Sequence, residues 1–214
     1  MEVTKYLLTI IGGYLLGSLS TSIFMSRSVL GGDVRKRGSG NAGATNMARI
    51  YGMGAGVLTL LGDALKAAAA MYIGHRLLGD VGIAAGGLAV LLGHCFPIFH
   101  HFHGGKGVSV GAAIGLAVDW RVFLAIVCAF LVGALLTRKV SIGSICAAVT
   151  VSVAALAVGV STPKLVLCLC GMVLVVFQHR ENIKRIMKGT EPDFKAAKHL
   201  PEIRKSRKKD MDLS

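Results

Sequence analysis

Long runs without a charged side chain dominate this sequence. Residues 6–26, 81–105, 122–137, 140–163 and 165–179 contain no Asp, Glu, Lys or Arg. A helix needs ~20 mostly apolar residues to cross a bilayer, so most of these runs are long enough or nearly so. The chain must therefore place most of its length where water does not reach.

Two further segments are apolar but less regular. Residues 50–76 are interrupted only by Asp63, Lys66 and Arg76, and residues 107–118 are apolar but short. At ~1.5 Å per residue the short segment reaches only ~18 Å, so it is a short helix, uses flanking residues or is re-entrant. Charged residues make up 16% of the chain, whereas soluble domains have ~25%. The pattern predicts an all-α polytopic integral membrane protein, a bundle of seven transmembrane helices.

The distribution of basic residues predicts the orientation. The net charge is +13 with 24 Lys and Arg residues. Seven crossings with the N-terminus outside put most of them, including the C-terminal end, on the cytoplasmic side, as the positive-inside rule requires. We expect residues 1–194 to form one transmembrane catalytic domain. Residues 195–214 are expected to form a basic cytoplasmic tail suited to an anionic leaflet. Because the excess charge is confined to one face of a membrane protein, it does not indicate a nucleic-acid partner.

The first polar motif is R-K-R-G-S-G-N-A-G-A-T-N-M-A-R, residues 35–49. Glycines let a backbone turn its N–H groups toward an anion, and an arginine fork suits phosphate. A flexible basic connector would need the charge but not the run of small polar residues. The candidate ligands in this motif are Ser39, Asn41, Thr45, Asn46 and Arg49.

The second motif is F-H-G-G-K-G-V, residues 102–108. It sets Lys106 among Gly104, Gly105 and Gly107, just before a predicted helix start, where phosphate binds readily. It is not a Walker A motif, which requires G-x-x-x-x-G-K-[ST]. A tight turn with one anchoring cation is the alternative.

Two more motifs are placed on the same predicted face. The third motif is F-Q-H-R-E-N-I-K-R-I-M-K-G-T-E-P, residues 177–192, in which His179 and Asn182 are three residues apart and share one side of a helix. His179 could act as acid, base or donor, or simply end a membrane helix. Ser141 and Ser144 lie at the start of another helix, where Ser141 could instead be only an N-cap.

The four motifs converge on one thin layer of space in this topology. They would supply two cations, hydroxyls and backbone N–H groups beside an apolar bundle, which suits a phosphorylated substrate below and an acyl chain above. A transporter of a small phosphorylated metabolite is the main alternative, with Asp63 and Lys66 on its path. We favour a bracing ion pair for those two residues. A structural scaffold would not explain two glycine-rich basic loops.

Other patterns carry less weight. Four histidines invite a metal interpretation, but no carboxylate or thiolate set accompanies them, so no metal or cofactor is expected. The H-x-x-x-x-D pattern from His75 to Asp80 falls on the predicted outer face and is attributed to chance. The five cysteines lie in or beside apolar segments and are interpreted as packing residues. The histidines are His94, His100, His101 and His103.

At these motifs the chain resembles the bacterial acyl-phosphate:glycerol-3-phosphate acyltransferase family, known as PlsY. The shared stretches are Y-L-L-G-S-L-S, D-V-R-K-R-G-S-G-N-A-G-A-T-N-M-A-R, G-H-C-F-P-I-F, F-H-G-G-K-G-V and H-R-E-N-I-K-R. The resemblance extends to residue ~195. The chain departs from it at His103, where lysine is common, and at Ala67, where glycine is common.

The resemblance implies a reaction and a set of partners. An acyl phosphate would donate its acyl group to the 1-hydroxyl of glycerol 3-phosphate, giving lysophosphatidic acid and inorganic phosphate. It also implies the bacterial cytoplasmic (inner) membrane, membrane lipids as surroundings and an upstream enzyme that forms the acyl phosphate. Catalytic roles carry over to Ser39, Arg49, Lys106, His179 and Asn182, and glycerol 3-phosphate binding to the GGKG glycines.

An acyl phosphate is already activated, so we expect direct attack without an acyl-enzyme. The proton of the attacking hydroxyl could go to the donor phosphate or to His179.

Overall fold

The computed structural model describes residues 2–197, and these residues form helices joined by short loops. Within that range there is no strand, which confirms the all-α prediction. Short 3-10 or π turns occupy Met25–Val29, Val34–Lys36 and Ile98–His100. The helices are α1 Glu2–Ser18, α2 Thr21–Phe24, α3 Ala44–Tyr51, α4 Met53–Cys95, α5 Val108–Val118, α6 Trp120–Thr137, α7 Val140–Val158, α8 Thr162–Gln178 and α9 Arg180–Met187.

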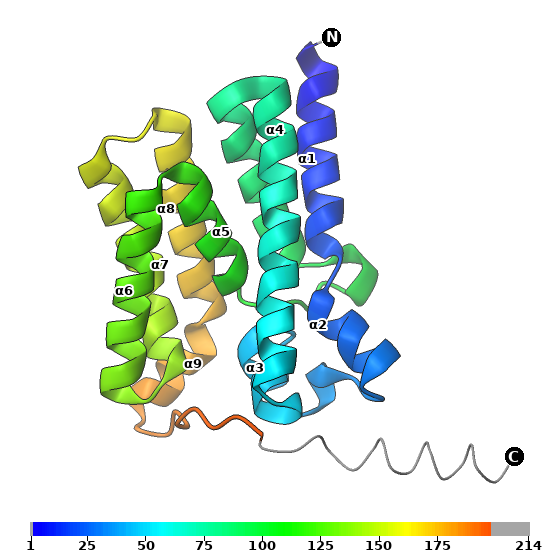
Figure 1. Cartoon of the computed structure of the whole chain (residues 1–214), viewed down its shortest axis with the longest axis vertical. Coiled ribbons are helices and arrows are strands. Elements are labelled where there is room, and N and C mark those ends of the chain that lie inside the picture. The colour runs from blue at the N-terminus through cyan, green and yellow to red at the C-terminus, as the bar shows by residue number, and fades with distance from the viewer. Residues whose placement is uncertain (1, 198–214) are drawn as a thin grey trace, which may run out of the picture.

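The long helices stand side by side as a bundle (Figure 1). α1 and α4 pack together on one side, α6, α7 and α8 on the other, and α5 lies between the two groups. The short helices α3 and α9 lie at the end of the bundle opposite the N-terminus. This arrangement brings the polar loops that flank α3 and α9 to one end.

The helix α4 is a hairpin of two antiparallel limbs. Its helical path is broken at Gly79, where φ is 58° and ψ is −138°. On either side of that turn the two limbs touch backbone to backbone. A Cβ on Gly74 would collide with the carbonyl of Gly82, and a Cβ on Gly82 would collide with the carbonyl of Gly74. Small residues permit such contact between apolar helices. The predicted boundary between the segments 50–76 and 81–105 therefore coincides with a reversal of the chain.

Apolar surface faces outward over much of the bundle. On α6, Leu135 and Leu136 are 75% and 81% exposed, a pattern that a soluble monomer avoids. By length and composition four of the described helices can cross a membrane, or five if the bent pair α8–α9 is one span, with α4 counted once. α5 is a shorter apolar helix of 11 residues. The number of seven crossings and the orientation of the termini remain predictions.

A buried polar cluster braces the first half of the bundle. Lys66 Nζ lies 3.0 Å from Asp63 Oδ1 and 3.1 Å from His94 Nδ1, which belongs to the second limb of α4. Lys66 also donates to the carbonyls of Gly17 and Leu19, at 2.9 and 2.6 Å. The predicted pairing of Asp63 with Lys66 is confirmed. The pair ties α4 to the end of α1 and has all its partners inside the protein.

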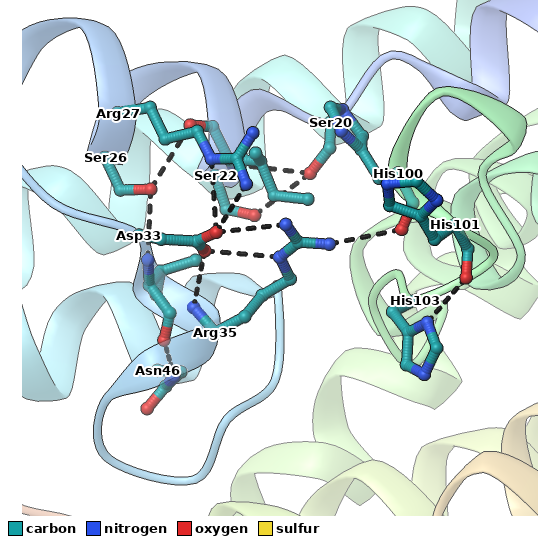
Figure 2. A network of polar contacts seen from close by, with 12 residues as sticks. Ser20, Ser22, Ser26, Arg27, Asp33, Arg35, Asn46, His100, His101 and His103 are labelled. Carbon is teal, nitrogen blue, oxygen red and sulfur yellow. Dashed lines mark hydrogen bonds and ion pairs between the residues drawn. The ribbon is translucent and has the colours of Figure 1, made fainter.

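A second polar network fixes the loop before α3 (Figure 2). Asp33 accepts hydrogen bonds from the guanidinium groups of Arg27 and Arg35, at 2.7 and 3.0 Å. These arginines hold the pKa of the Asp33 carboxyl far below its usual range. Arg35 also donates to the carbonyl of His100, at 3.1 Å. The network joins the first polar loop to the loop that leads to the glycine motif.

The segment after α9 runs back across the same end of the bundle. In this C-terminal strap (residues 188–197), Asp193 pairs with Lys139 at 2.9 Å. The amide of Phe194 donates to the carbonyl of Arg138, and that of Ala197 to the carbonyl of Ala48. The strap therefore links the α6–α7 turn to α3. The predicted domain boundary at residue 194 remains a prediction, and most of the predicted tail, residues 198–214, lies outside the described residues.

Candidate functional site

One cavity of about 670 Å³ collects residues from all four polar motifs. It lies where the loop before α3, the glycine loop before α5, the start of α7 and the α8–α9 turn meet. The predicted site residues that line it are Ser39, Asn41, Thr45, Asn46, Arg49, Lys106, Gly107, Ser141, Ser144, His179 and Asn182. The structure thus brings together segments that are up to 143 residues apart in the sequence, from position 39 to position 182.

Asn46 holds the first loop in shape. Its side-chain oxygen accepts from the amide of Ser39, at 3.0 Å, and its nitrogen faces the carbonyls of Val34, Arg37 and Asn41. The side chain is 2% exposed, so both ends of the amide serve the backbone. The structure gives Asn46 a positioning role, since its polar atoms are occupied before any ligand arrives.

Arg49 contributes a cation without a carboxylate partner. It lies in the last turn of α3 and lines the cavity. Within residues 2–197 no Asp or Glu lies within 4.0 Å of its guanidinium, in contrast to Arg27 and Arg35. The charge of Arg49 is therefore available to an anionic ligand.

Lys106 is the second such cation. Gly107, with φ of 86°, turns the chain into the first residue of α5, and Lys106 Nζ donates to Oδ1 of Asn182. Burial, together with Arg185 and Arg49, lowers the pKa of Lys106 to about 8. Such a lysine is protonated near neutral pH, and a bound phosphate would favour the charged form.

Gly104 and Gly105 do not line the cavity. They pack against the end of α4, where a Cβ on Gly105 would collide with the His94 ring, and the Gly105 amide donates to the His94 carbonyl at 3.0 Å. These two glycines allow the loop to lie flat on α4 and so place Lys106. Of the three predicted glycines, only Gly107 faces the cavity.

His179 sits at the bend between α8 and α9 and is 2% exposed. Its Nδ1 lies 2.8 Å from the carbonyl of Val175, and only a protonated nitrogen can bond there. Burial lowers the pKa of His179 to about 4, so the ring is neutral at pH 7. Its Nε2 is then an acceptor of hydrogen bonds.

Ser141 and Ser144 lie in the first two turns of α7. Ser144 donates to the carbonyl of Val140, at 2.9 Å, whereas Ser141 donates to the carboxylate of Glu191, at 2.6 Å. Ser141 is within α7 and is not its N-cap, which is Lys139. Both hydroxyls line the cavity.

Several lining residues were not expected from the sequence. Glu191 and Arg185 are charged, and His94 reaches the cavity from the buried cluster. Glu191 and Arg185 lie within the third motif, residues 177–192, but no spacing signal there marks them as site residues. Gly38 and Gly43, two glycines of the first motif, also line the cavity, and the other lining residues that were not singled out are Ala44, Leu60, Val108, Ser109, Phe130, Val140, Thr190 and Pro192.

The remaining sequence patterns lie elsewhere. Among residues 2–197, no three His, Cys, Asp or Glu side chains are close enough together to hold a metal ion. Asp80 accepts from Ser161 at 2.6 Å and pairs with Lys164 at 3.0 Å. This clasp joins the α4 turn to the start of α8, and neither His75 nor Asp80 lines the cavity.

Known proteins resemble this chain over most of its length. The model of the glycerol-3-phosphate acyltransferase family matches residues 7–189. The glycerol-3-phosphate acyltransferase of Syntrophotalea carbinolica is 38% identical, over 91% of this chain and all of the relative. That of Geobacter sulfurreducens is 41% identical, over 86% and 94%.

Two solved structures share the fold. One is the crystal structure of PlsY (YgiH), an integral membrane glycerol 3-phosphate acyltransferase, in its glycerol 3-phosphate form. It is 34% identical, with a TM-score of 0.85, and the alignment covers 89% of this chain and 96% of that one. The lysophosphatidic acid form superposes with a TM-score of 0.81 at the same identity, covering 89% and 95%.

Proposed function

The chain belongs to the glycerol-3-phosphate acyltransferase family of integral membrane enzymes, and on that premise we propose how its cavity works. The proposed donor is an acyl phosphate, and the acceptor is the 1-hydroxyl of glycerol 3-phosphate. The products are lysophosphatidic acid and inorganic phosphate. The proposed location is the bacterial inner membrane, with the cavity on the cytoplasmic side.

The observation that carries this proposal is the presence in one cavity of two cations that form no ion pair with a carboxylate among the described residues. Arg49 has no carboxylate partner among the described residues, and Lys106 bonds to an amide oxygen. A reaction between glycerol 3-phosphate and an acyl phosphate brings two phosphates together, and two available cations reduce their repulsion. Apolar residues at the cavity wall, Leu60 and Phe130, offer a surface for the start of an acyl chain.

In the proposed step the 1-hydroxyl oxygen attacks the acyl carbonyl carbon. The carbon–oxygen bond to phosphate then breaks, and inorganic phosphate leaves with the bonding electrons. Ser39 Oγ and the Nδ2 hydrogen of Asn182 that does not bond to Glu191 are proposed to donate to the acyl phosphate and to the developing oxyanion, where a fixed donor is most effective. No covalent acyl-enzyme is required, because phosphate is already a good leaving group.

The departing phosphate is the proposed acceptor of the hydroxyl proton. A general base works best when its pKa is near the operating pH. The pKa of His179, lowered to about 4 by burial, makes its ring a weak base. We therefore assign His179 to accept a hydrogen bond through Nε2 and so orient a substrate.

The test uses the purified chain in detergent with an acyl phosphate and glycerol 3-phosphate. We expect stoichiometric release of inorganic phosphate and formation of lysophosphatidic acid. Parallel reactions with acyl-CoA identify the donor: turnover with acyl-CoA and none with acyl phosphate would overturn the proposed donor. A trapped acyl group on Ser39 would overturn the direct attack.

A transporter remains less well supported by the arrangement of polar groups. Its path would run through Asp63 and Lys66, but these side chains are saturated by partners inside the protein. The two cavity cations, Arg49 and Lys106, lie instead at the end of the bundle that carries α3 and α9 (Figure 1).

A further inference from the structure

Glu191 is the only carboxylate among the residues that line the cavity within the described part of the chain. It lies in the C-terminal strap, two residues beyond the end of the family match at 189. The side chain is buried, with the residue 8% exposed. A buried carboxylate is costly unless it is paired and hydrogen-bonded, so its partners indicate what it does.

Three donors from two helices meet at this carboxylate. Ser141 Oγ and Asn182 Nδ2 both donate to Oε1, at 2.6 and 2.7 Å, and Arg185 Nε donates to Oε2, at 2.7 Å. All three donors line the cavity. Burial raises the pKa of Glu191, but the three hydrogen bonds together outweigh burial and lower this pKa below its usual value, so Glu191 is ionised at neutral pH.

The contact with Asn182 sets the direction of its amide. An ionised carboxylate only accepts hydrogen bonds, so the nitrogen end of Asn182 must face Glu191. The oxygen end then faces Lys106, whose ammonium donates to it. With the carboxylate gone, the amide could turn and present its own N–H groups to the lysine, which has no acceptor to offer.

The charge of Glu191 also acts on Lys106. The charged and titratable groups around Lys106 are Arg49 from α3, His179 from the α8–α9 bend, Arg185 from α9 and Glu191 from the strap. Of these only Glu191 favours the protonated lysine, since His179 is neutral and the arginines repel it. Neutralising Glu191 therefore lowers the pKa of Lys106 further.

We propose that Glu191 is a positioning residue of the acyltransferase: it orients Asn182 and Arg185 and keeps the Lys106 ammonium directed into the cavity. This inference rests on the proposed function, because it assigns Lys106 and Asn182 to the reaction. It adds the end of the third motif, residues 177–192, to the residues that act on the proposed site.

The test compares Glu191→Ala and the isosteric Glu191→Gln with Asp193→Asn. Asp193 is the matched control, because it anchors the same strap through Lys139 but does not line the cavity. Loss of a residue that orients a functional group costs about ten- to a hundredfold. We expect that loss in kcat for Glu191→Ala and a smaller one for Glu191→Gln. In both, the alkaline limb of the pH profile should move to lower pH, while Asp193→Asn stays within about twofold of the parent, as other surface changes do.

Two results would overturn the inference. Glu191→Ala and Glu191→Gln could keep the parent kcat and alkaline limb. Alternatively, all three variants could lose activity and thermal stability to the same extent, which would make Glu191 only an anchor of the strap. If the Glu191→Ala variant fails to fold, the kcat and pH profile of Glu191→Gln decide between the two roles, since glutamine has the same shape as glutamate.

Calorimetric binding of glycerol 3-phosphate separates this inference from the proposed function. If the parent binds glycerol 3-phosphate but does not use acyl phosphate, only the proposed donor is overturned. The role of Glu191 is then tested by the affinity of its variants for glycerol 3-phosphate. Weaker binding at pH 8.5 in Glu191→Gln than in Asp193→Asn supports its role, and equal binding overturns it. A parent that neither binds nor reacts overturns both.

Discussion

Lys66 and Lys106 are both largely buried lysines, but their partners differ. Lys66 has Asp63 at 3.0 Å and two backbone carbonyls, so its charge is neutralised inside the protein. Lys106 donates to the neutral amide of Asn182 and lies in a cavity with Arg49. A cation matched by a carboxylate stabilises the bundle, whereas a cation held by an amide keeps its charge for a ligand. The difference predicts that replacing Lys66 lowers the stability of the fold, whereas replacing Lys106 lowers the activity.

The largest effect is expected for Lys66→Met. Removal of one partner of a buried ion pair leaves the other charge uncompensated, which costs about 3–5 kcal/mol in the free energy of unfolding. The thermal midpoint in detergent measures this loss. In the double variant Asp63→Asn with Lys66→Met both charges are absent, so most of the stability should return. A single variant as stable as the parent would remove the distinction between the two lysines.

We expect the Lys106→Ala variant to fold as the parent does but to lose most of its acyltransferase activity. Removal of one group that stabilises developing charge lowers kcat by about a hundred- to a thousandfold. Steady-state rates of phosphate release test this, and the thermal midpoint should stay close to that of the parent. Normal turnover in this variant would mean that Lys106 is as structural as Lys66.

The parent should lose affinity for glycerol 3-phosphate in alkaline solution. Lys106, with a pKa of about 8, carries its charge below that pH and loses it above. The KM for glycerol 3-phosphate should therefore rise by about tenfold for each pH unit beyond 8, as a single required proton dictates. The control is Lys106→Arg, since arginine stays protonated throughout this range and its profile should be flat. An alkaline limb that persists in Lys106→Arg would belong to another group.

The smallest effect is expected for His179→Gln. A glutamine can still accept a hydrogen bond, and general-base catalysis contributes about 10²–10⁴-fold where it operates. If His179 only orients a substrate, the loss in kcat should stay within about tenfold and the pH profile should keep its shape. A loss above a hundredfold together with a missing acidic limb would make His179 the base.

Residues that lie in a short local motif, or that are spaced on one helix face, could be predicted from the sequence. The loops around Ser39 and Lys106 combine glycines with cations, so a shared phosphate-binding site could be predicted for them, and the structure brings both loops to one cavity. The pairing of Asp63 with Lys66 followed from their spacing on one helix face. His94 could not be placed with them, because its position depends on the reversal of α4 at Gly79.

Roles that depend on contacts distant in the sequence were not predictable. Asn46 was expected to bind a ligand, but only the folded loop shows that its amide is occupied by backbone groups. Gly104 and Gly105 belong to the glycine motif but face the end of α4. Glu191 lies in the third motif, but no local pattern distinguishes it, since its contacts are with Ser141, fifty residues earlier, and with Asn182.

The strap has a consequence for how the enzyme is made. The first cavity residues are synthesised near position 38, but the carboxylate that joins α7 to α9 arrives only at position 191. The anchors of the strap on Arg138 and Ala48 can form only later still, at Phe194 and Ala197. A chain that is still being inserted by the translocation machinery therefore has no finished site. The cavity lined by both Gly38 and Glu191 is complete only when the chain has left the ribosome as far as residue 191.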